Sequence, residues 1–273
     1  MAYFECKMKY MTLRSDIFSM FWPVYALDGK SKGYVDFEYR GISLTITSSE
    51  FGRATVKDKE VIIYCLSHLM AAQNMKIEIN RKVLFCRYDF LKTTNRGTSG
   101  KDYKILDNAL KRLKGTRLTT DATISDIKIP EDTSMIEDFR KVQINENVYW
   151  EVTLPEWLFA IVENRKVLKL DDGYFNLNPF ERRLYEICKK CCGRKPSYEF
   201  PIDNMKKRIG VKLTKSQFKR RLRRCRRLLG LGILFDDKDV LIFNLTAGGS
   251  VLFKGRAKEL GIEFKEGEDE DEN

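Results

Sequence analysis

The 273-residue chain contains a single histidine, and this scarcity excludes several kinds of chemistry at once. A histidine-rich metal site cannot be built, and the two metal-binding histidines of a nicking-type replication enzyme are missing. A Ser-His-Asp or Cys-His hydrolase would have to use His68. That residue lies in the apolar-periodic segment 61–70, which predicts a helix with the histidine at its surface or boundary. With no Walker loop and no carboxylates at metal spacing, we expect no catalytic residue, no metal and no cofactor.

The seven cysteines form no recognisable framework, because their number is odd and their spacing is irregular. Cys188-x-x-Cys191-Cys192 has no second pair to complete a zinc site, and Cys188 and Cys191 instead continue the apolar stripe of a predicted helix. Free thiols are typical of a reducing cytosol, so the sequence predicts a cytoplasmic protein.

No apolar run of the sequence is long enough to cross a membrane. The segment 17–27 comes nearest to a signal peptide, but Pro23 interrupts it, and Trp22 and Tyr25 do not suit a cleavage site. We therefore expect no membrane association, and we interpret residues 17–27 as an extended segment that covers the core.

Acidic residues are absent from one long stretch, since none lies between Asp203 and Asp236. Residues 194–230 hold fourteen basic residues against two acidic ones, a net charge of +12, while the whole chain carries +11. Residues 266–272 show the opposite imbalance, with six acids, no base and no periodicity, and we expect this tail to be disordered. A basic block confined to one stretch requires a polyanionic partner.

Two segments of the chain repeat one pattern 115 residues apart. A capping box opens each of them, as S-x-x-D from Ser99 and as T-x-x-Q from Thr214, and satisfies free N–H groups of a first helical turn. Each helix is expected to stop sixteen positions after its cap, at Gly115 and Gly230. The expected core positions are Tyr103, Leu106, Leu110 and Leu113 in the first helix and Phe218, Leu222, Cys225 and Leu229 in the second.

Each long helix is preceded by a shorter helix and a turn, which is the helix-turn-helix arrangement. The short helices are expected at 88–94 and 203–209, and the supporting helices that precede them at 56–72 and 180–192. A further helix is expected to begin near Pro155 and to join the two copies. Each copy thus contains the same three successive helices: a supporting helix, a short helix and a long helix.

After each long helix the apolar period changes from 3.6 to about two, which predicts a β-hairpin. One hairpin begins at 116–120 and returns through 141–150 after a long polar loop, and the other lies at 233–243. Three helices followed by a hairpin define a winged helix, so the sequence predicts an α+β fold with two winged-helix domains in tandem. The expected division is an extended N-terminal segment (1–40), a first winged-helix domain with a linker helix (41–169), a second winged-helix domain as the main DNA-reading module (170–250), and a C-terminal segment with the acidic tail (251–273).

The outward face of the second long helix is basic, whereas a solvated helix normally mixes charges of both signs. Major-groove reading uses the first half of a recognition helix, so that half is expected to contact bases. The candidates for base or near-base contacts are Ser216, Lys219, Arg220, Arg223 and Arg224. The candidates for phosphate contacts are Arg226, Arg227, Lys206, Lys207 and Lys212.

The first long helix has a weaker basic face. Its candidates for DNA contact are Lys101, Lys104, Asn108 and Arg112, and asparagine can pair with adenine through two hydrogen bonds. Dimerisation is the alternative role for this copy, so a homodimer through the first domain stays open. The second wing tip, 236–239, carries three acids that phosphates would repel, which favours a protein contact or a wing that does not follow the backbone.

Several segments of the chain carry a common family pattern. They are residues 23–27, 42–46, 54–65, and 89–96 leading into 106–116. In combination they resemble the bacterial plasmid replication initiator protein A family, although each segment alone is a weak signal. The likeness covers most of residues 17–246, and the extreme N-terminus and the acidic tail lie outside it.

The resemblance implies a non-enzymatic initiator that binds double-stranded DNA in the bacterial cytoplasm, associated with plasmid or nucleoid DNA. Related tandem winged-helix initiators bind repeated sites at a plasmid origin, help open adjacent A·T-rich duplex and recruit host replication proteins. Many also bind and repress their own promoter as dimers. Two alternatives stay open: a transcriptional repressor without origin function, and a structural or RNA-associated protein that uses the arginine helix as a general grip on polyanions.

Overall fold

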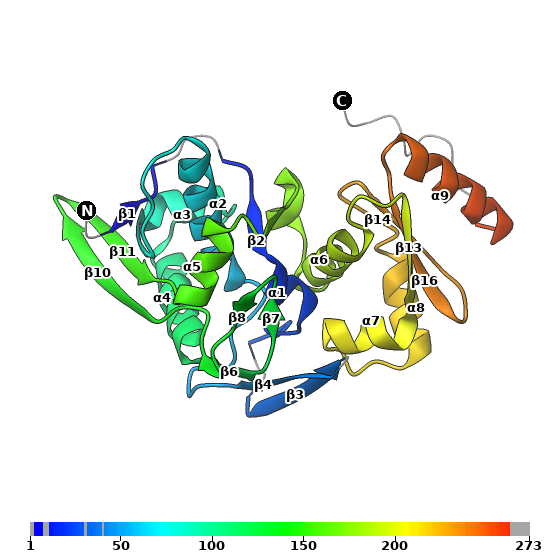
Figure 1. Ribbon diagram of the computed structural model, residues 1–273, viewed down its shortest axis with the longest axis horizontal. Helices are drawn as coiled ribbons and strands as arrows, with labels where there is room; N and C mark the ends of the chain where they lie inside the picture. Colours follow the sequence, from blue (N-terminus) through cyan, green and yellow to red (C-terminus); the bar gives the residue numbers. More distant parts are fainter. Residues whose placement is uncertain (1–2, 8–10, 30–31, 40, 263–273) are drawn as a thin grey trace. The chain divides into compact units, whose positions relative to one another are not determined.

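The structure is a computed structural model that describes residues 3–7, 11–29, 32–39 and 41–262. The chain divides into two compact units, residues 1–183 and residues 184–273, and the division lies inside helix α6 (Pro179–Cys192) (Figure 1). This division falls later in the chain than the boundary expected between residues 169 and 170. Each unit combines helices with mostly antiparallel strands, and the fold is α+β, with two winged-helix units in tandem.

The first unit contains most of the regular elements. Its helices are α1 (Ile17–Phe21), α2 (Lys59–Asn74), α3 (Arg87–Thr93), α4 (Gly100–Gly115), α5 (Glu156–Glu163) and the 3-10 helix η1 (Asp172–Asn176). Its strands are β1 (Phe4–Glu5), β2 (Arg14–Asp16), β3 (Tyr34–Tyr39), β4 (Ile42–Thr47), β5 (Lys82–Cys86), β6 (Arg117–Thr120), β7 (Thr123–Ile124), β8 (Ile127–Lys128), β9 (Asp132–Thr133), β10 (Asp138–Ile144), β11 (Asn147–Thr153) and β12 (Val167–Lys169). The helices α2, α3, α4 and α5 confirm the four helices expected in this part of the chain.

The wing of the first unit is the hairpin of β10 and β11, drawn in green in Figure 1. These two strands continue a sheet of order β1-β5-β11-β10, so that β5 joins the short helix α3 to the wing. A two-residue turn closes the hairpin between Ile144 and Asn147, and Asn145 takes a positive φ of 52° in it. Asparagine tolerates this left-handed conformation better than most residues.

The prediction that residues 116–120 begin this wing is wrong. They form β6, which pairs with β4 and β9 in a separate sheet of order β3-β4-β6-β9. The register places Leu118 opposite Ile46, and both side chains are fully buried. Burial of this apolar face therefore decides the pairing of β6, whereas the period of two in the sequence indicates a strand and not its partner.

The N-terminal segment covers the core of the first unit as expected, but part of it is helical. The carboxylate of Asp16 accepts hydrogen bonds from the backbone N–H and the hydroxyl of Ser19, both at 2.6 Å, and so caps helix α1. This cap explains why a short helix replaces the expected extended chain. Phe18, Trp22 and Val24 are buried in the same core as α2.

The supporting helix α2 forms as predicted, but His68 does not lie at its surface. Its side chain is 3% exposed and packs on Tyr64, with 4.4 Å between the ring centres. Burial lowers the pKa of His68 to about 4, so the ring is neutral near pH 7. The prediction failed because nearly every residue of α2 is buried, whereas an amphipathic helix would leave one face in water.

The second unit repeats the plan of the first. Its helices are the later part of α6, followed by α7 (Ile202–Ile209), α8 (Lys215–Arg223) and α9 (Ala247–Glu259). Its strands are β13 (Ser197–Pro201), β14 (Arg227–Leu228), β15 (Leu231–Phe235) and β16 (Asp239–Asn244), in the sheet order β13-β16-β15-β14. The predicted hairpin at 233–243 is confirmed as β15 and β16, and β13 occupies the place that β5 has in the first unit.

Neither long helix ends at its glycine in the expected way. Helix α8 stops at Arg223, and the chain then forms β14, whose two-residue turn at Leu229 and Gly230 has φ values of 42° and 77°. Crowded cations weaken a longer helix, and pairing with β15 gives the backbone other hydrogen-bond partners. Gly115 is the last residue of α4, and a Cβ there would lie 2.5 Å from the Cβ of Ser49. That close approach, and not a left-handed turn, requires glycine at this position.

Helix α9 was not expected from the sequence. Phe253 and Ala257 are buried against β15 and β16, and Gly232 on β15 makes room for the aromatic ring, since a Cβ there would lie 2.3 Å from it. The helix ends before Gly261, which has a positive φ of 65°. The acidic tail that the sequence predicts to be disordered, residues 266–272, lies outside the described residues.

Candidate nucleic-acid interface

Both predicted recognition helices begin with the capping box that the sequence indicated. In α4 the backbone N–H and the hydroxyl of Ser99 donate to the Asp102 carboxylate at 3.0 and 2.6 Å, and these bonds lower the pKa of Asp102. In α8 the N–H of Gln217 donates to the Thr214 hydroxyl at 3.2 Å, and the N–H of Thr214 donates to the Gln217 side chain at 3.0 Å. Because these bonds satisfy terminal N–H groups, they fix where each helix starts.

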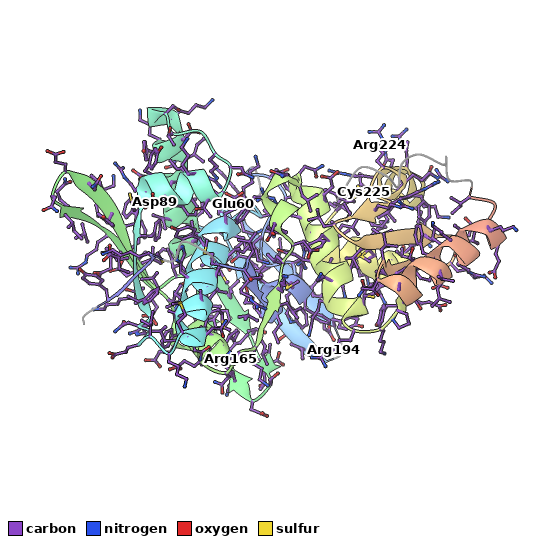
Figure 2. All side chains as sticks on the ribbon, turned by 90° about the horizontal axis from the view of Figure 1, so that it is seen from above. Glu60, Asp89, Arg165, Arg194, Arg224 and Cys225 are labelled. Carbon is purple, nitrogen blue, oxygen red and sulfur yellow. The ribbon has the colours of Figure 1, made fainter. Side chains whose placement is uncertain are left out.

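The solvent face of α8 is rich in cations. Phe218 and Leu222 are fully buried and hold the helix on the core of the second unit. Figure 2 shows Arg224 extending away from the ribbon, whereas the next residue, Cys225, is buried. The predicted site residues that are exposed on α8 and at its end are Ser216, Arg220, Arg223 and Arg224.

The acidic residues at the tip of the second wing form hydrogen bonds and an ion pair within the second unit. Asp236 accepts hydrogen bonds from the N–H groups of Lys238 and Asp239 at 2.7 and 2.8 Å and closes the turn. Asp237 forms an ion pair with Lys219 of α8. These contacts hold the pKa values of Asp236 and Asp237 below their usual range. The pair explains the acidic tip, and it engages Lys219 with the wing, so we leave this lysine out of the group that contacts bases.

Arg226 and Arg227 lie beyond the end of α8, contrary to the predicted helix, and both are half-buried. Arg227 begins β14, and its guanidinium lies 5.8 Å from the ring centre of Phe253 on α9. Arg226 lines a hollow of about 230 Å³ together with Arg223 and Ile262. The two arginines therefore flank the end of the helix and do not extend its outward face.

Two of the predicted lysines, Lys206 and Lys207, lie on α7, and Lys212 lies in the turn that leads to α8. Lys207 and Lys212 are exposed, and Lys206 is half-buried. Gly210 ends α7 with a φ of 78°, and its N–H donates to the carbonyl of Lys206 at 3.0 Å, a left-handed cap that redirects the chain. Lys207 and Lys212 are thus available to a phosphate backbone.

The outward face of α4 carries three of its four predicted residues. Lys101, Lys104 and Asn108 are exposed, and Ile105 is 40% exposed beside them. Sequence reasoning missed Ile105, because an apolar residue in a helix is normally assigned to the core. An asparagine next to an exposed isoleucine can combine two hydrogen bonds to adenine with an apolar contact to a thymine methyl group.

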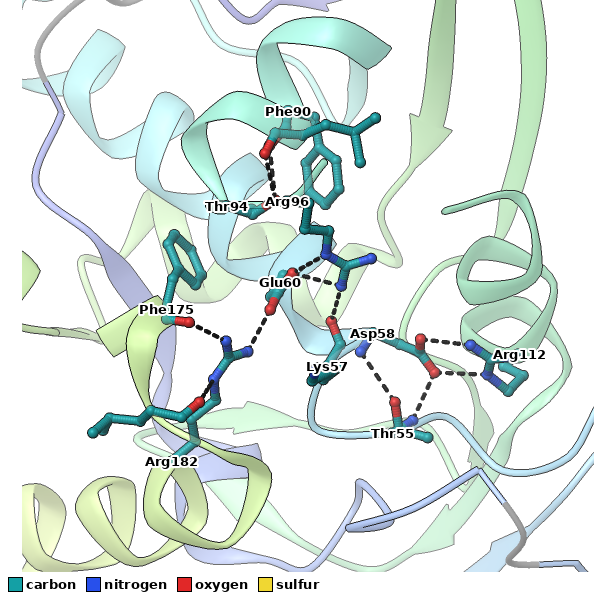
Figure 3. A network of polar contacts seen from close by, with 12 residues as sticks. Thr55, Lys57, Asp58, Glu60, Phe90, Thr94, Arg96, Arg112, Phe175 and Arg182 are labelled. Carbon is teal, nitrogen blue, oxygen red and sulfur yellow. Dashed lines mark hydrogen bonds and ion pairs between the residues drawn. The ribbon is translucent and has the colours of Figure 1, made fainter. Parts of the chain in front are cut away.

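The fourth residue, Arg112, is engaged inside the first unit (Figure 3). Its Nε and Nη2 donate to the two carboxylate oxygens of Asp58, both at 2.7 Å, and this pair raises the pKa of Arg112. Asp58 also accepts a hydrogen bond from the N–H of Thr55 at 2.8 Å. The helical projection placed Arg112 correctly but could not reveal a carboxylate 54 residues away in the sequence, so we leave it out of the interface.

A second buried ion-pair network lies next to this one in the first unit (Figure 3). The side chain of Glu60 is 2% exposed and pairs with both Arg96 and Arg182. The Nε of Arg96 donates to the Glu60 carboxylate at 2.6 Å. Arg182 also donates to the carbonyls of Phe175 and Leu177 at 2.6 and 2.8 Å. Buried charges require such partners, so these arginines are engaged inside the unit and are not available to DNA.

The described part of the chain offers no cluster of three or more histidine, cysteine or acidic side chains that could hold a metal ion. All seven cysteines are free thiols, and burial raises the pKa of Cys65 to about 12 and that of Cys188 well above its usual value. Such buried thiols stay protonated near pH 7. Within the same described residues, no helix is long and apolar enough to span a membrane.

Two winged-helix units with an exposed basic recognition helix define a DNA-binding protein. The family model of replication initiator protein A matches residues 14–228, and the chain belongs to this family of replication initiators. It is 31% identical over 224 residues to a protein of Wigglesworthia glossinidia brevipalpis that carries a replication-protein name, and the match covers 79% of this chain and 81% of that protein.

Solved structures confirm the arrangement of the fold. A crystal structure of domains 2 and 3 of RctB matches 82% of this chain and 95% of its own, with a TM-score of 0.57 and 10% identity. A second crystal structure of the same domains matches 88% of this chain and 100% of its own, with a TM-score of 0.54 and 11% identity. At these identities the likeness concerns the fold alone.

Proposed function

We propose that this initiator binds double-stranded DNA sequence-specifically through α8 at repeated sites of a plasmid origin, and that it acts there without catalysis. The observation that carries the proposal is the outward face of α8, where exposed arginines stand on a capped helix and no acidic residue occurs between Asp203 and Asp236. Like charges three or four residues apart destabilise a helix by roughly 0.2–0.5 kcal/mol per pair. A DNA groove supplies the missing anions.

The geometry of α8 suits a major groove. An α-helix with its side chains is about 10–12 Å across, which fits the groove width of about 12 Å, and α8 exposes Ser216 in its first half and Arg220 and Arg223 in its second half. Arginine can donate to O6 and N7 of guanine in a bidentate pair, so we assign Arg220 and Arg223 to base contacts. We assign Lys207 and Lys212, which are exposed, to phosphate contacts on the flank of the helix.

We assign α4 a second and weaker DNA contact. Lys101 and Lys104 would bind phosphates, and Asn108 with Ile105 would favour an A·T base pair. Dimerisation through the first unit is the alternative role for this face. Origin opening beside the bound repeats, recruitment of host replication proteins and repression of its own promoter belong to the same proposal, and membership in the initiator family supports them.

The experiment is a footprint of the purified protein on DNA around its own gene, at about 150 mM salt, where non-specific binding is weakened. We expect ordered protection of several same-direction repeats, spaced by one helical turn or a multiple of it. Protection of a single palindrome would replace the initiator proposal with a repressor. Tight DNA retention without a discrete footprint would mean that the arginines of α8 bind charge and do not read sequence.

A further inference from the structure

Helix α9 ends close to two arginines at the end of α8, Arg223 and Arg226. Beyond the helix, the N–H of Ile262 donates to the carbonyl of Ala257 at 2.8 Å, and the N–H of Gly261 donates to that of Lys258 at 3.1 Å. This pair of bonds is the Schellman type of helix end, which fixes the direction in which the chain leaves. Ile262 is half-buried and lines the hollow of about 230 Å³ that Arg223 and Arg226 also line. The residue that follows is Glu263.

The chain beyond Ile262 is strongly acidic. Residues 263–273 hold seven acids and one base, Lys265, a net charge of −6. Glu266 follows Ile262 by four residues and Glu272 by ten, so they can reach at most about 14 Å and about 35 Å from it. Those reaches cover the length of α8, about 13 Å. The segment 263–273 is called the acidic tail below.

Three carboxylates on the second wing and on α9 already have partners in the second unit. Asp236 also lines the hollow, but it accepts the N–H groups of the wing turn. Asp237 pairs with Lys219, and Glu259 pairs with Arg256 at 2.5 Å. The acidic tail follows directly on Ile262, which lines the same hollow as Arg223, and its carboxylates are additional to those in these pairs.

We propose that the acidic tail docks on the arginine surface formed by Arg220 and Arg223 of α8 and by Arg224 and Arg226 beyond its end, and competes there with DNA. The docking itself follows from the exit point and the charges, while the competition rests on the proposed function of α8. A tethered segment acts at an effective concentration on the order of millimolar, so even a weak contact is occupied for much of the time. Because the tail must leave before any duplex binds, it lowers the affinity for specific and for random DNA by the same factor.

The docking is tested on the full-length chain without DNA, at about 50 mM salt, where screening is moderate. The backbone amide chemical shifts of residues 263–273 are compared with those of a peptide of the same sequence. We expect them to differ, and to move to the peptide values in an Arg223→Gln, Arg226→Gln double variant. A matched Lys128→Gln, Lys166→Gln variant, which removes two exposed cations of the first unit, is expected to leave them unchanged. Peptide-like shifts in the unaltered chain, or equal effects of both variants, would overturn the docking.

The competition is tested with a tail in which all acids of 266–272 become glutamine or asparagine. We expect this change to tighten binding of specific and random duplex by the same factor, about three- to tenfold. A shuffled order of the same acidic residues, which keeps the charge, is expected to leave both affinities as they are. Unchanged affinities with the neutral tail would overturn the competition even if the shifts show docking. Docking without any footprint on DNA would instead overturn the proposed function alone.

Discussion

Helices α4 and α8 begin alike, but their basic side chains differ in the partners that the fold gives them. Both start with a capping box, yet α4 runs for sixteen residues and α8 for nine. Cations of α4 have carboxylate partners in the first unit: Arg112 pairs with Asp58, and Lys114 with Asp138 at 2.6 Å. α8 contains no acid, its lysines Lys215 and Lys219 pair with Asp203 and Asp237 outside the helix, and Arg220 and Arg223 are exposed. The difference teaches that a basic residue on a predicted recognition helix indicates DNA contact only when it is not paired with a carboxylate inside the protein.

The contrast predicts opposite effects on stability for two arginines. Arg112→Ala leaves the carboxylate of Asp58, which is 2% exposed, without its main partner, so we expect the free energy of unfolding to fall by about 3 kcal/mol. Arg223→Ala removes an exposed side chain and is expected to change it by no more than about 0.5 kcal/mol. Urea unfolding of both variants measures the difference. Equal losses would show that the two helices do not differ in this way.

A second difference concerns pH, because His68 lies in the core of the first unit. Its pKa is about 4 in the folded chain and about 6.5 when unfolded, so the unfolded state binds the proton first as the pH falls. We expect this group to remove about 3 kcal/mol of stability between pH 6.5 and pH 4 and to have no effect above that range. The measurement is the unfolding free energy against pH for the unaltered chain and for His68→Gln. Parallel curves for the two proteins would contradict burial of a neutral ring.

Base reading by α8 is tested by Arg220→Ala. We expect a loss of roughly 1–3 kcal/mol of specific binding together with a relaxed base preference at one position, because the bidentate pair with guanine is lost. Competition with duplexes changed at single positions measures both effects. If affinity for random duplex falls by the same factor, Arg220 binds phosphate and does not read a base.

The smallest expected effect is that of Lys207→Ala on α7. This exposed lysine is assigned to a phosphate, so we expect binding to weaken alike for every sequence and the slope of log affinity against log salt to fall by about one. A salt titration on specific and on random duplex measures the slope. A loss confined to the specific site would assign Lys207 to base reading.

The sequence predicted those parts of the fold that local patterns determine. The capping boxes at Ser99 and Thr214, the second wing and the burial of Phe218 and Leu222 all follow from side chains within a few residues of one another, and the structure confirms them. The return of the first wing through 141–150 is confirmed as β10 and β11, but its start at 116–120 was misplaced because the partner of β6 lies at least 70 residues away, on β4. Long-range pairing depends on which apolar faces meet, and a period of two does not contain that information.

The candidate site was predicted less completely than the fold. Arg220 and Arg223 are exposed where the helical projection placed them, whereas Arg112 and Lys219 are paired with carboxylates distant in sequence. Helical periodicity gives the direction of a side chain but not the charge that it meets. The early end of α8 likewise depends on the pairing of β14 with β15, which leaves Arg226 and Arg227 outside the helix.

The central claim is that α8, and not α4, is the main DNA-reading helix. The most direct measurement compares two variants with equal loss of charge on the duplex found by footprinting. One changes Arg220, Arg223 and Arg224 to Gln in α8 and at its end, and the other changes Lys101, Lys104 and Lys111, a third exposed lysine of α4, to Gln. With folding verified by circular dichroism, we predict at least about a 100-fold loss of specific affinity for the α8 variant and about tenfold or less for the α4 variant. Equal losses, or a larger loss for the α4 variant, would contradict the account.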